Sequence, residues 1–367
     1  MFHSPGTIRR RLCPGLLVLV LLAGLPSLLR AQTPERHDEP QAAPTPSRPD
    51  FVIHAFGSVD WTASQRPETP NSFALGQMAL FVTSAINDRV SVLAEVVLEA
   101  SGVNTEVTTD LERLQLTYRL NDHLNISAGR YHTGIGYYNA AFHHGSYFEI
   151  PIGRPRVFAF EDEGGVLPVH EVGLSVRGQV PYTGSALRYV AEVGNGRNWA
   201  DLDTDEGKDN NSAKSTNVGL ALRPERWRGF EAGASFYRDE IPPAVGPVIA
   251  HRITAAYAVY RTPSTEVMGE WLHLWHRPSG GATFTNDGGY VQASRAFGKL
   301  RPYYRYDRLA ISGATPLIGS FDSSESHLLG LRVDPADWVG LKGQYERRSE
   351  RDGAFFNAVH VQLVFVF

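Results

Sequence analysis

Apolar and polar residues alternate along most of the chain from Phe51 onward, and this period of two predicts β-strands that each present two different faces. The last segment shows the pattern most clearly. Its apolar face consists of Val359, Val361, Leu363, Phe365 and Phe367, which alternate with Ala358, His360, Gln362 and Val364. The segments around Leu114 and Ile253 alternate in the same way, and no window carries the spacing of a long amphipathic helix.

The alternation predicts about 16 strands, an even number as in single-chain bacterial membrane barrels. They are expected near 51–62, 73–86, 90–101, 110–120, 123–132, 171–180, 186–194, 216–223, 228–238, 250–261, 265–276, 286–297, 300–310, 326–334, 338–348 and 355–367.

The connections between these strands alternate between two kinds. Tight turns rich in Asn, Asp, Pro and Gly fall at 87–88, 121–122, 181–184, 224–226, 263–264, 298–299 and 334–336. Longer polar connections fall at 63–72, 102–109, 133–170, 195–215, 239–249, 277–285, 311–325 and 349–354. Short turns on one side and long loops on the other are typical of a transmembrane barrel, whereas a soluble sandwich has no need of them. The sequence therefore predicts an all-β, antiparallel transmembrane β-barrel.

If the apolar parity faces lipid, the other parity faces the lumen, and it carries charges of both signs. The lumen-facing charges expected from parity include Arg113, Arg119, Arg177, Arg252, Arg301, Arg305, Glu95, Glu99 and Glu270. A charge facing lipid at the bilayer midplane costs about 2–4 kcal/mol, so these residues indicate a hydrated interior. Barrels of about 16 strands are wide enough for an aqueous channel. We therefore expect a porin that lets small polar or ionic solutes diffuse through.

The longest connection, 133–170, is unusually rich in aromatic and apolar residues for an exposed loop. Such a loop needs a surface to pack on, and the lumen wall offers one. We expect this third extracellular loop to fold inward and form a constriction. The candidates for charge at that constriction are Arg154, Arg156, Glu161, Asp162 and Glu163. The alternative is a loop that forms a lid or a trimer contact, with its charges merely solvated.

The first fifty residues predict export. Basic residues at 9–11, an apolar stretch at 16–23 and small or polar residues near Ala31 are typical of a signal peptide spanning 1–31. Its removal takes away the one cysteine, Cys13, together with four arginines and no acids, so the net charge of −4 becomes −8. An acidic mature chain argues against a nucleic-acid partner. Residues 32–50 hold five prolines and predict an extended periplasmic linker before a barrel at 51–367.

The segment Gly129-Arg130-Tyr131-His132-Thr133-Gly134-Ile135-Gly136 resembles the strand end that leads into the constriction loop of the phosphate-selective porin O/P-like family. The resemblance implies a bacterial outer-membrane porin of 16 strands, commonly a homotrimer, surrounded by outer-membrane lipid and lipopolysaccharide. His132 stands where that family often has lysine, and the proline that follows it there is absent. The resemblance therefore concerns the architecture and leaves the solute open.

Other classes find less support in the sequence. His143, His144 and His170 share the long loop with several acids, but no spacing fixes two ligands on one face, so we expect no metal site and no cofactor. The GxSxG elbow of a hydrolase and the phosphate-binding P-loop are both missing, which disfavours an enzyme. A substrate-specific transporter of hydrophobic or anionic solutes remains the main alternative, with a barrel-embedded hydrolase after it.

Overall fold

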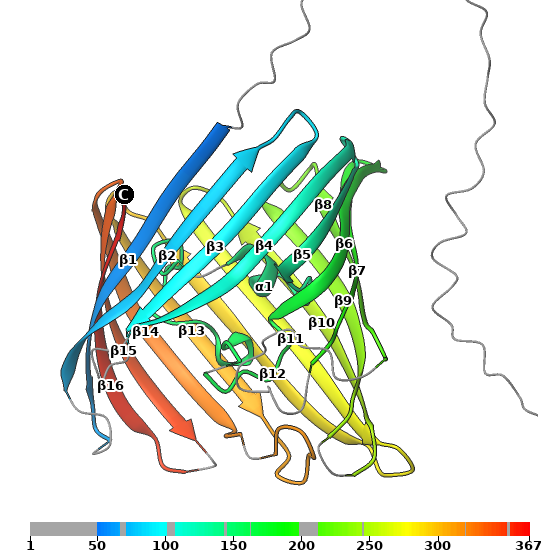
Figure 1. Cartoon of the computed structure of the whole chain (residues 1–367). Helices are drawn as coiled ribbons and strands as arrows, with labels where there is room; N and C mark the ends of the chain where they lie inside the picture. Colours follow the sequence, from blue (N-terminus) through cyan, green and yellow to red (C-terminus); the bar gives the residue numbers. More distant parts are fainter. Residues whose placement is uncertain are drawn as a thin grey trace, which may run out of the picture. The chain divides into compact units, whose positions relative to one another are not determined.

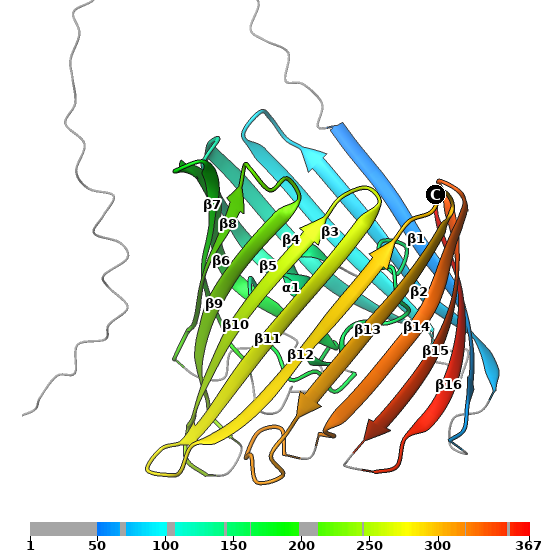
Figure 2. The same cartoon turned by 180° about the vertical axis from the view of Figure 1, so that it is seen from behind.

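The computed structural model describes residues 50–66, 71–100, 107–142, 145–161, 163–197, 212–243, 246–319, 321–350 and 353–367. These residues form sixteen antiparallel strands, each hydrogen-bonded to its neighbours in sequence, and β1 pairs with β16 to close the barrel. Figure 1 and Figure 2 show the closed wall from opposite sides, with a short helix inside it. The predicted all-β barrel of sixteen strands is confirmed. The predicted signal peptide and most of the linker lie outside the described residues.

The element bounds agree closely with the predicted strands. The strands are β1 (Asp50–Ser64), β2 (Ser72–Ala85), β3 (Val90–Ala100), β4 (Val107–Asn121), β5 (Leu124–His132), β6 (His170–Tyr182), β7 (Ser185–Gly194), β8 (Ser215–Pro224), β9 (Phe230–Ile241), β10 (Ile249–Arg261), β11 (Thr265–Pro278), β12 (Phe284–Arg295), β13 (Leu300–Ala310), β14 (Ser324–Ala336), β15 (Val339–Glu350) and β16 (Phe356–Val366). Helix α1 (Tyr138–Ala141) and the 3₁₀ turn η3 (Arg156–Phe158) lie between β5 and β6.

In two of the tight turns, an asparagine side chain accepts hydrogen bonds from backbone N–H groups of the turn. The side-chain oxygen of Asn87 accepts hydrogen bonds from the N–H groups of Arg89 and Val90, both at 2.9 Å, and so closes the turn between β2 and β3. Asn121 accepts one from His123 at 2.8 Å in the turn between β4 and β5. Short turns therefore alternate with longer connections around the barrel, as the sequence predicts.

The outer wall is apolar. Strand residues such as Leu114, Leu220, Leu329 and Val361 are exposed, and they alternate with residues that face the interior. Among the described residues, no helix has the length and apolar character needed to cross a membrane.

Strand β10 departs from the expected parity. Ile253 and Val259 are buried in the interior apolar cluster, whereas Arg252 is exposed and alternates with them. Arg252 therefore does not face the lumen, and the expectation that it does was wrong. The physical reason is that this part of the wall packs against an apolar loop, so its apolar face points inward.

Gly129 in β5 gives a test of the wall's backbone. It has φ +130°, and an added Cβ would lie 1.9 Å from the carbonyl oxygen of Leu114 on β4. We expect Gly129→Ala to lower the free energy of unfolding by about 1–3 kcal/mol, because the residue cannot hold this conformation without strain. The urea midpoint of the protein folded in lipid vesicles measures the change.

Gly343→Ala is the matched control, since an added Cβ there has open space around it. Its effect should stay within about 0.5 kcal/mol. Equal shifts in the two variants would show that the conformation of Gly129 carries no special constraint.

Candidate functional site

The described parts of the long loop 133–169 lie inside the barrel, where both views show α1 (Figures 1 and 2) and where η3 contacts β12 and β13. Its buried apolar residues join strand residues in one cluster. From the loop this cluster holds Ile135, Tyr138, Phe142, Val157, Phe158, Phe160, Val166, Leu167 and Val169, and from the wall Tyr237, Ile253, Met268, Leu272, Leu274, Tyr290 and Leu309. The inward fold predicted from the loop's composition is therefore confirmed, and its apolar residues are buried as that prediction required.

Acidic side chains hold the first part of the loop by accepting its backbone N–H groups. Glu270 of β11 is buried and accepts hydrogen bonds from the N–H groups of Tyr137 at 2.6 Å and Tyr138 at 2.7 Å, at the start of α1. Glu192 of β7 accepts one from Gly134 at 2.8 Å. Glu270 thus faces the interior, as predicted, but it serves as an anchor for the loop.

Tyr138 lies at the centre of the loop's packing. Its ring stacks on Phe158, and its hydroxyl donates a hydrogen bond to Glu149 at 2.9 Å. Burial, followed by the negative charge of Glu149, raises the pKa of this hydroxyl well above its usual value. The phenol therefore stays protonated and keeps its role as a donor.

Cationic side chains hold the second part of the loop by donating to its backbone carbonyls. Arg332 donates to the carbonyl of Tyr147 at 2.6 Å and to that of Glu149 at 3.0 Å. Arg305 donates to Gly153 and Arg154, and Lys342 donates to Ser146 and Pro151. Buried carbonyls need such partners because water is excluded. Arg305 is predicted to face the lumen and does face the interior, where it holds the loop.

The predicted constriction charges are largely used within the loop. Arg154 lies over the ring of Phe160, with its guanidinium carbon 4.1 Å from the ring centre, and donates to the carbonyl of Phe158 at 2.7 Å. Arg156 donates to the carbonyl of Glu163 at 2.8 Å. Glu161 is buried and accepts hydrogen bonds from the backbone of Val169 and His170. Asp162 lies outside the described residues, and a role of this group in lining the pore stays a prediction.

The remaining predicted lumen charges differ in their surroundings. Glu95 and Arg113 form a buried ion pair, and Glu99 accepts a hydrogen bond from Gln77. Arg119 and Arg301 lie near tight turns, where they donate to the backbone carbonyls of Asp88 at 2.7 Å and Pro263 at 2.8 Å.

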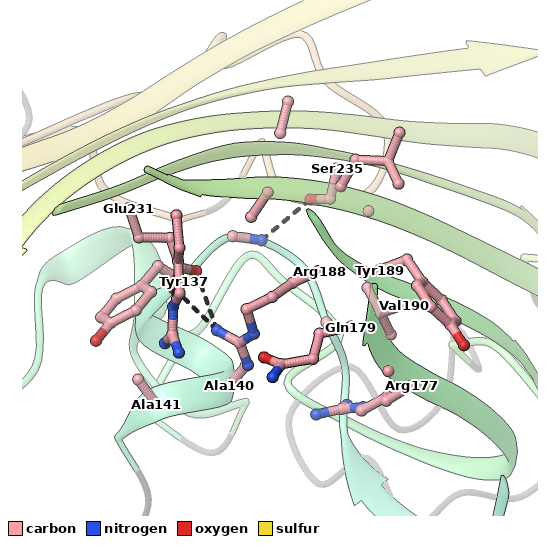
Figure 3. A pocket seen from close by; sticks show the side chains of 18 of the residues that line it. Tyr137, Ala140, Ala141, Arg177, Gln179, Arg188, Tyr189, Val190, Glu231 and Ser235 are labelled. Atoms are coloured by element: carbon pink, nitrogen blue, oxygen red, sulfur yellow. Dashed lines mark hydrogen bonds and ion pairs between the residues drawn. The ribbon is translucent and has the colours of Figure 1, made fainter. Parts of the chain in front are cut away.

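A cavity of about 480 Å³ lies between the α1 part of the loop and the inner wall of β6 to β10 (Figure 3). Three arginines line it, namely Arg177, Arg188 and Arg223, together with Glu231 and the ring of Tyr137. Arg223 was not among the predicted lumen residues. The parity of β8 could have revealed it, because it falls on the face opposite the exposed Leu220 and Leu222.

The ion pairs along this wall share one asymmetry. The side chains of Arg177, Arg188 and Arg223 are 37%, 43% and 48% exposed, whereas their partners Glu192 and Glu231 are 0% and 4% exposed. The pair of Arg261 and Glu266 repeats this, at 42% and 4%. The carboxylates are thus buried against the wall, and the guanidinium groups meet the water.

Arg332 gives a test of the loop's attachment. Arg332→Met removes the donor to the carbonyls of Tyr147 and Glu149, which should cost about 1–3 kcal/mol of local stability. We expect backbone amides of residues 145–154 to exchange with deuterium at least about tenfold faster, as measured by mass spectrometry.

Arg252→Met is the control, because Arg252 lies on the outer face and contacts no part of the loop in the described residues. It should leave exchange in 145–154 unchanged. Unchanged exchange in Arg332→Met would mean that packing alone holds the loop.

Comparison with known proteins leaves the family open but supports the fold. No protein-family model matches the chain, and no curated protein matches its sequence. Among solved structures, the anion-selective porin from Comamonas acidovorans is 11% identical, with a TM-score of 0.60 over 87% of this chain and 100% of its own. The outer membrane channel DcaP of Acinetobacter baumannii is also 11% identical, with a TM-score of 0.58 over 88% and 99% of the two chains. The trimer form of OmpT, an outer membrane protein of Vibrio cholerae, is 9% identical, with a TM-score of 0.58 over 87% and 99%. The chain therefore has the fold of the sixteen-stranded porins.

Proposed function

We propose that this protein is a bacterial outer-membrane channel through which small polar solutes diffuse passively, with a modest preference for anions. The observation that carries the proposal is the asymmetry of the ion pairs along β6 to β11. In each of them the arginine meets the water and the glutamate is buried.

The outer wall supports a membrane location. Its exposed strand residues include many leucine, valine and aromatic side chains, and bilayer lipid or lipopolysaccharide would cover them. Residues 1–31 would direct export as a cleaved signal peptide.

The structural neighbours add two supporting points. One is described as an anion-selective porin and another as a trimer. We carry both properties to this chain as part of the proposal, so that three copies would each contain one channel.

The expected anion preference is modest for a physical reason. Guanidinium groups that face water in a narrow passage raise the local concentration of anions. Glu231, which pairs with Arg188 and Arg223, and Asp122, which also lines the cavity, offset part of that charge. Salt also screens the remainder over about 8–10 Å near physiological ionic strength, so the preference should weaken as salt rises.

Recordings in a planar bilayer test the channel itself. The purified protein in a planar bilayer should give stepwise, ohmic openings, and under a potassium chloride gradient the reversal potential should have the sign of chloride preference. A folded, heat-modifiable protein that gives no openings would contradict the open channel and favour a substrate-specific transporter.

Two charge-removing variants test the origin of the anion preference. Arg188→Gln removes one water-facing cation and should move the reversal potential toward potassium, whereas Glu231→Gln removes the buried anion and should move it toward chloride. The same salt-gradient recording measures both.

Arg252→Gln is the matched control for Arg188→Gln, since it removes the same charge from the outer face. It should leave the reversal potential unchanged. Shifts of the same sign in Arg188→Gln and Glu231→Gln would show that this cavity does not set the selectivity.

A further inference from the structure

Two histidines face each other where the long loop leaves and rejoins the wall. His132 ends β5 and His170 begins β6, and the two are directly paired across the antiparallel strands. Their Nε2 atoms lie 3.1 Å apart. Side chains directly opposite in such a pair lie on the same face of the sheet, so the contact follows from the register.

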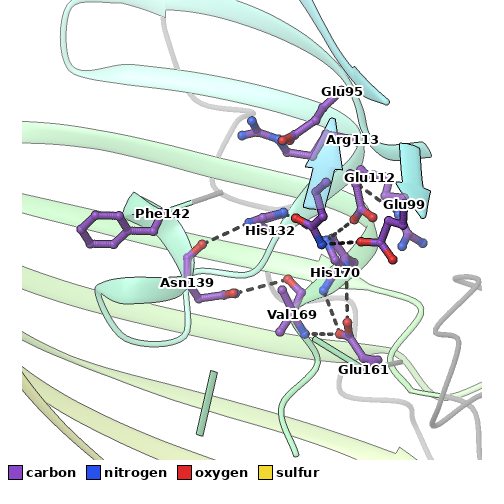
Figure 4. Close-up of polar contacts among 12 residues, drawn as sticks. Glu95, Glu99, Glu112, Arg113, His132, Asn139, Phe142, Glu161, Val169 and His170 are labelled. Carbon is purple, nitrogen blue, oxygen red and sulfur yellow. Dashed lines mark hydrogen bonds and ion pairs between the residues drawn. The ribbon is translucent and has the colours of Figure 1, made fainter. Parts of the chain in front are cut away.

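A carboxylate from a third strand contacts this histidine pair. Glu112 of β4 lies with its Oε2 atom 2.7 Å from the Nε2 atom of His170 (Figure 4). A β-bulge brings it there: Glu95 and Val96 of β3 pair with Arg113 and Leu111, so Glu112 is the extra residue. Bulges commonly redirect a side chain in this way. Simple parity would have placed Glu112 on the lipid face, so the sequence analysis missed it.

The other nitrogen of each histidine is held by an acceptor. The Nδ1 atom of His132 lies 3.2 Å from the backbone carbonyl oxygen of Asn139, and Nδ1 of His170 lies 3.2 Å from a carboxylate oxygen of Glu161. A carbonyl oxygen only accepts, so Nδ1 of His132 carries the hydrogen. The same holds for His170 opposite the ionised carboxylate.

Two imidazole nitrogens and a carboxylate oxygen converge in one place, and each neutral ring presents the lone pair of its Nε2 atom there. The three ligand atoms lie within 4.8 Å of one another, and all three residues are buried, with exposures of 6%, 3% and 4% for Glu112, His132 and His170. A cation held between the three ligand atoms would be attracted by all of them. One proton on His170 could bridge only part of the set, whereas a metal ion contacts every member.

We propose that Glu112, His132 and His170 bind a divalent transition-metal ion of the zinc class. Imidazole nitrogen and carboxylate oxygen are ligands that Zn²⁺ prefers, and a tetrahedral ion with bonds of about 2.0–2.1 Å separates its ligands by about 3.3 Å. The distances from His170 Nε2 to His132 and to Glu112 are 3.1 Å and 2.7 Å. Ca²⁺ and Mg²⁺ prefer all-oxygen sites and fit less well.

The surroundings match those of metal-binding histidines. Such residues usually donate their second N–H to a carboxylate or a backbone carbonyl, which fixes the tautomer and the ring orientation. Glu161 and the carbonyl of Asn139 supply these two acceptors. Asn139 is itself buried and donates to the carbonyls of Thr133 and Val169, so the second layer is ordered as well. The ion would join both ends of the loop to each other and to β4.

Cobalt gives a direct test, because Co²⁺ bound to histidine and carboxylate absorbs visible light. The full chain, purified in detergent and stripped with a chelator, is titrated with CoCl₂ and then with ZnCl₂. We expect one Co²⁺ per chain, displaced by one equivalent of Zn²⁺ but not by Mg²⁺. His132→Ala and Glu112→Gln should lose the signal, and Glu161→Gln should weaken binding by about 10–100-fold.

Another pair of buried histidines supplies the control. His251 and His276 pair across β10 and β11 with ring centres 4.6 Å apart, and within the described residues they belong to no three-ligand group. The double variant His251→Ala/His276→Ala should keep the full Co²⁺ signal. The proposal is overturned if the wild type binds no Co²⁺, or if Glu112→Gln, which keeps the side chain's shape, binds it as the wild type does. Heat modifiability on a gel confirms that each variant is folded, and the channel recordings above are independent of this outcome.

Discussion

The backbone of the inward loop is the constraint on which the interior depends. A loop that packs inside a barrel loses its backbone hydrogen bonds to water. Its N–H and carbonyl groups therefore need hydrogen-bond partners from the wall. The structure divides this task by charge. Glu192 on β7 accepts the N–H of Gly134, and Glu270 on β11 accepts those of Tyr137 and Tyr138. Arg305, Arg332 and Lys342, on β13 to β15, donate to the carbonyls of residues 146–154.

The charged side chains along β6 to β9 determine which charge faces the cavity. Arginine carries its charge at the end of a long stem and can reach water while the stem lies along the wall. Glutamate is shorter and stays near the backbone. A wall with similar numbers of both therefore presents mainly guanidinium groups, as Arg177, Arg188 and Arg223 do beside the buried Glu192 and Glu231. The sign of the charge that the cavity lining exposes therefore depends on side-chain length as well as on composition.

The strands could be predicted from sequence because period-two alternation and Asn-, Pro- or Gly-rich turns are local signals. Arg252 was misplaced because parity alone does not say whether an apolar face meets lipid or a loop folded inside. Glu112 was missed because a bulge shifts the parity by one residue. The roles of Arg154 and Glu161 depend on contacts with residues such as Phe160 and His170 that only the folded loop brings into place. The local sequence pattern thus predicts the strands of the wall. The roles of the interior side chains depend on contacts between residues that are far apart in the sequence.

The position of the cavity follows from the same division of the wall. The apolar inner faces of β9 to β12 attract the loop's aromatic residues, and the cations of β13 to β15 hold the loop's far end. The inner faces of β6 to β8 offer arginines and small residues such as Gly219 and Ala221, which give an apolar loop little to pack on. The cavity lies between these strands and the α1 part of the loop, beside the exposed arginines. The packing that positions the loop also decides which charges line the cavity.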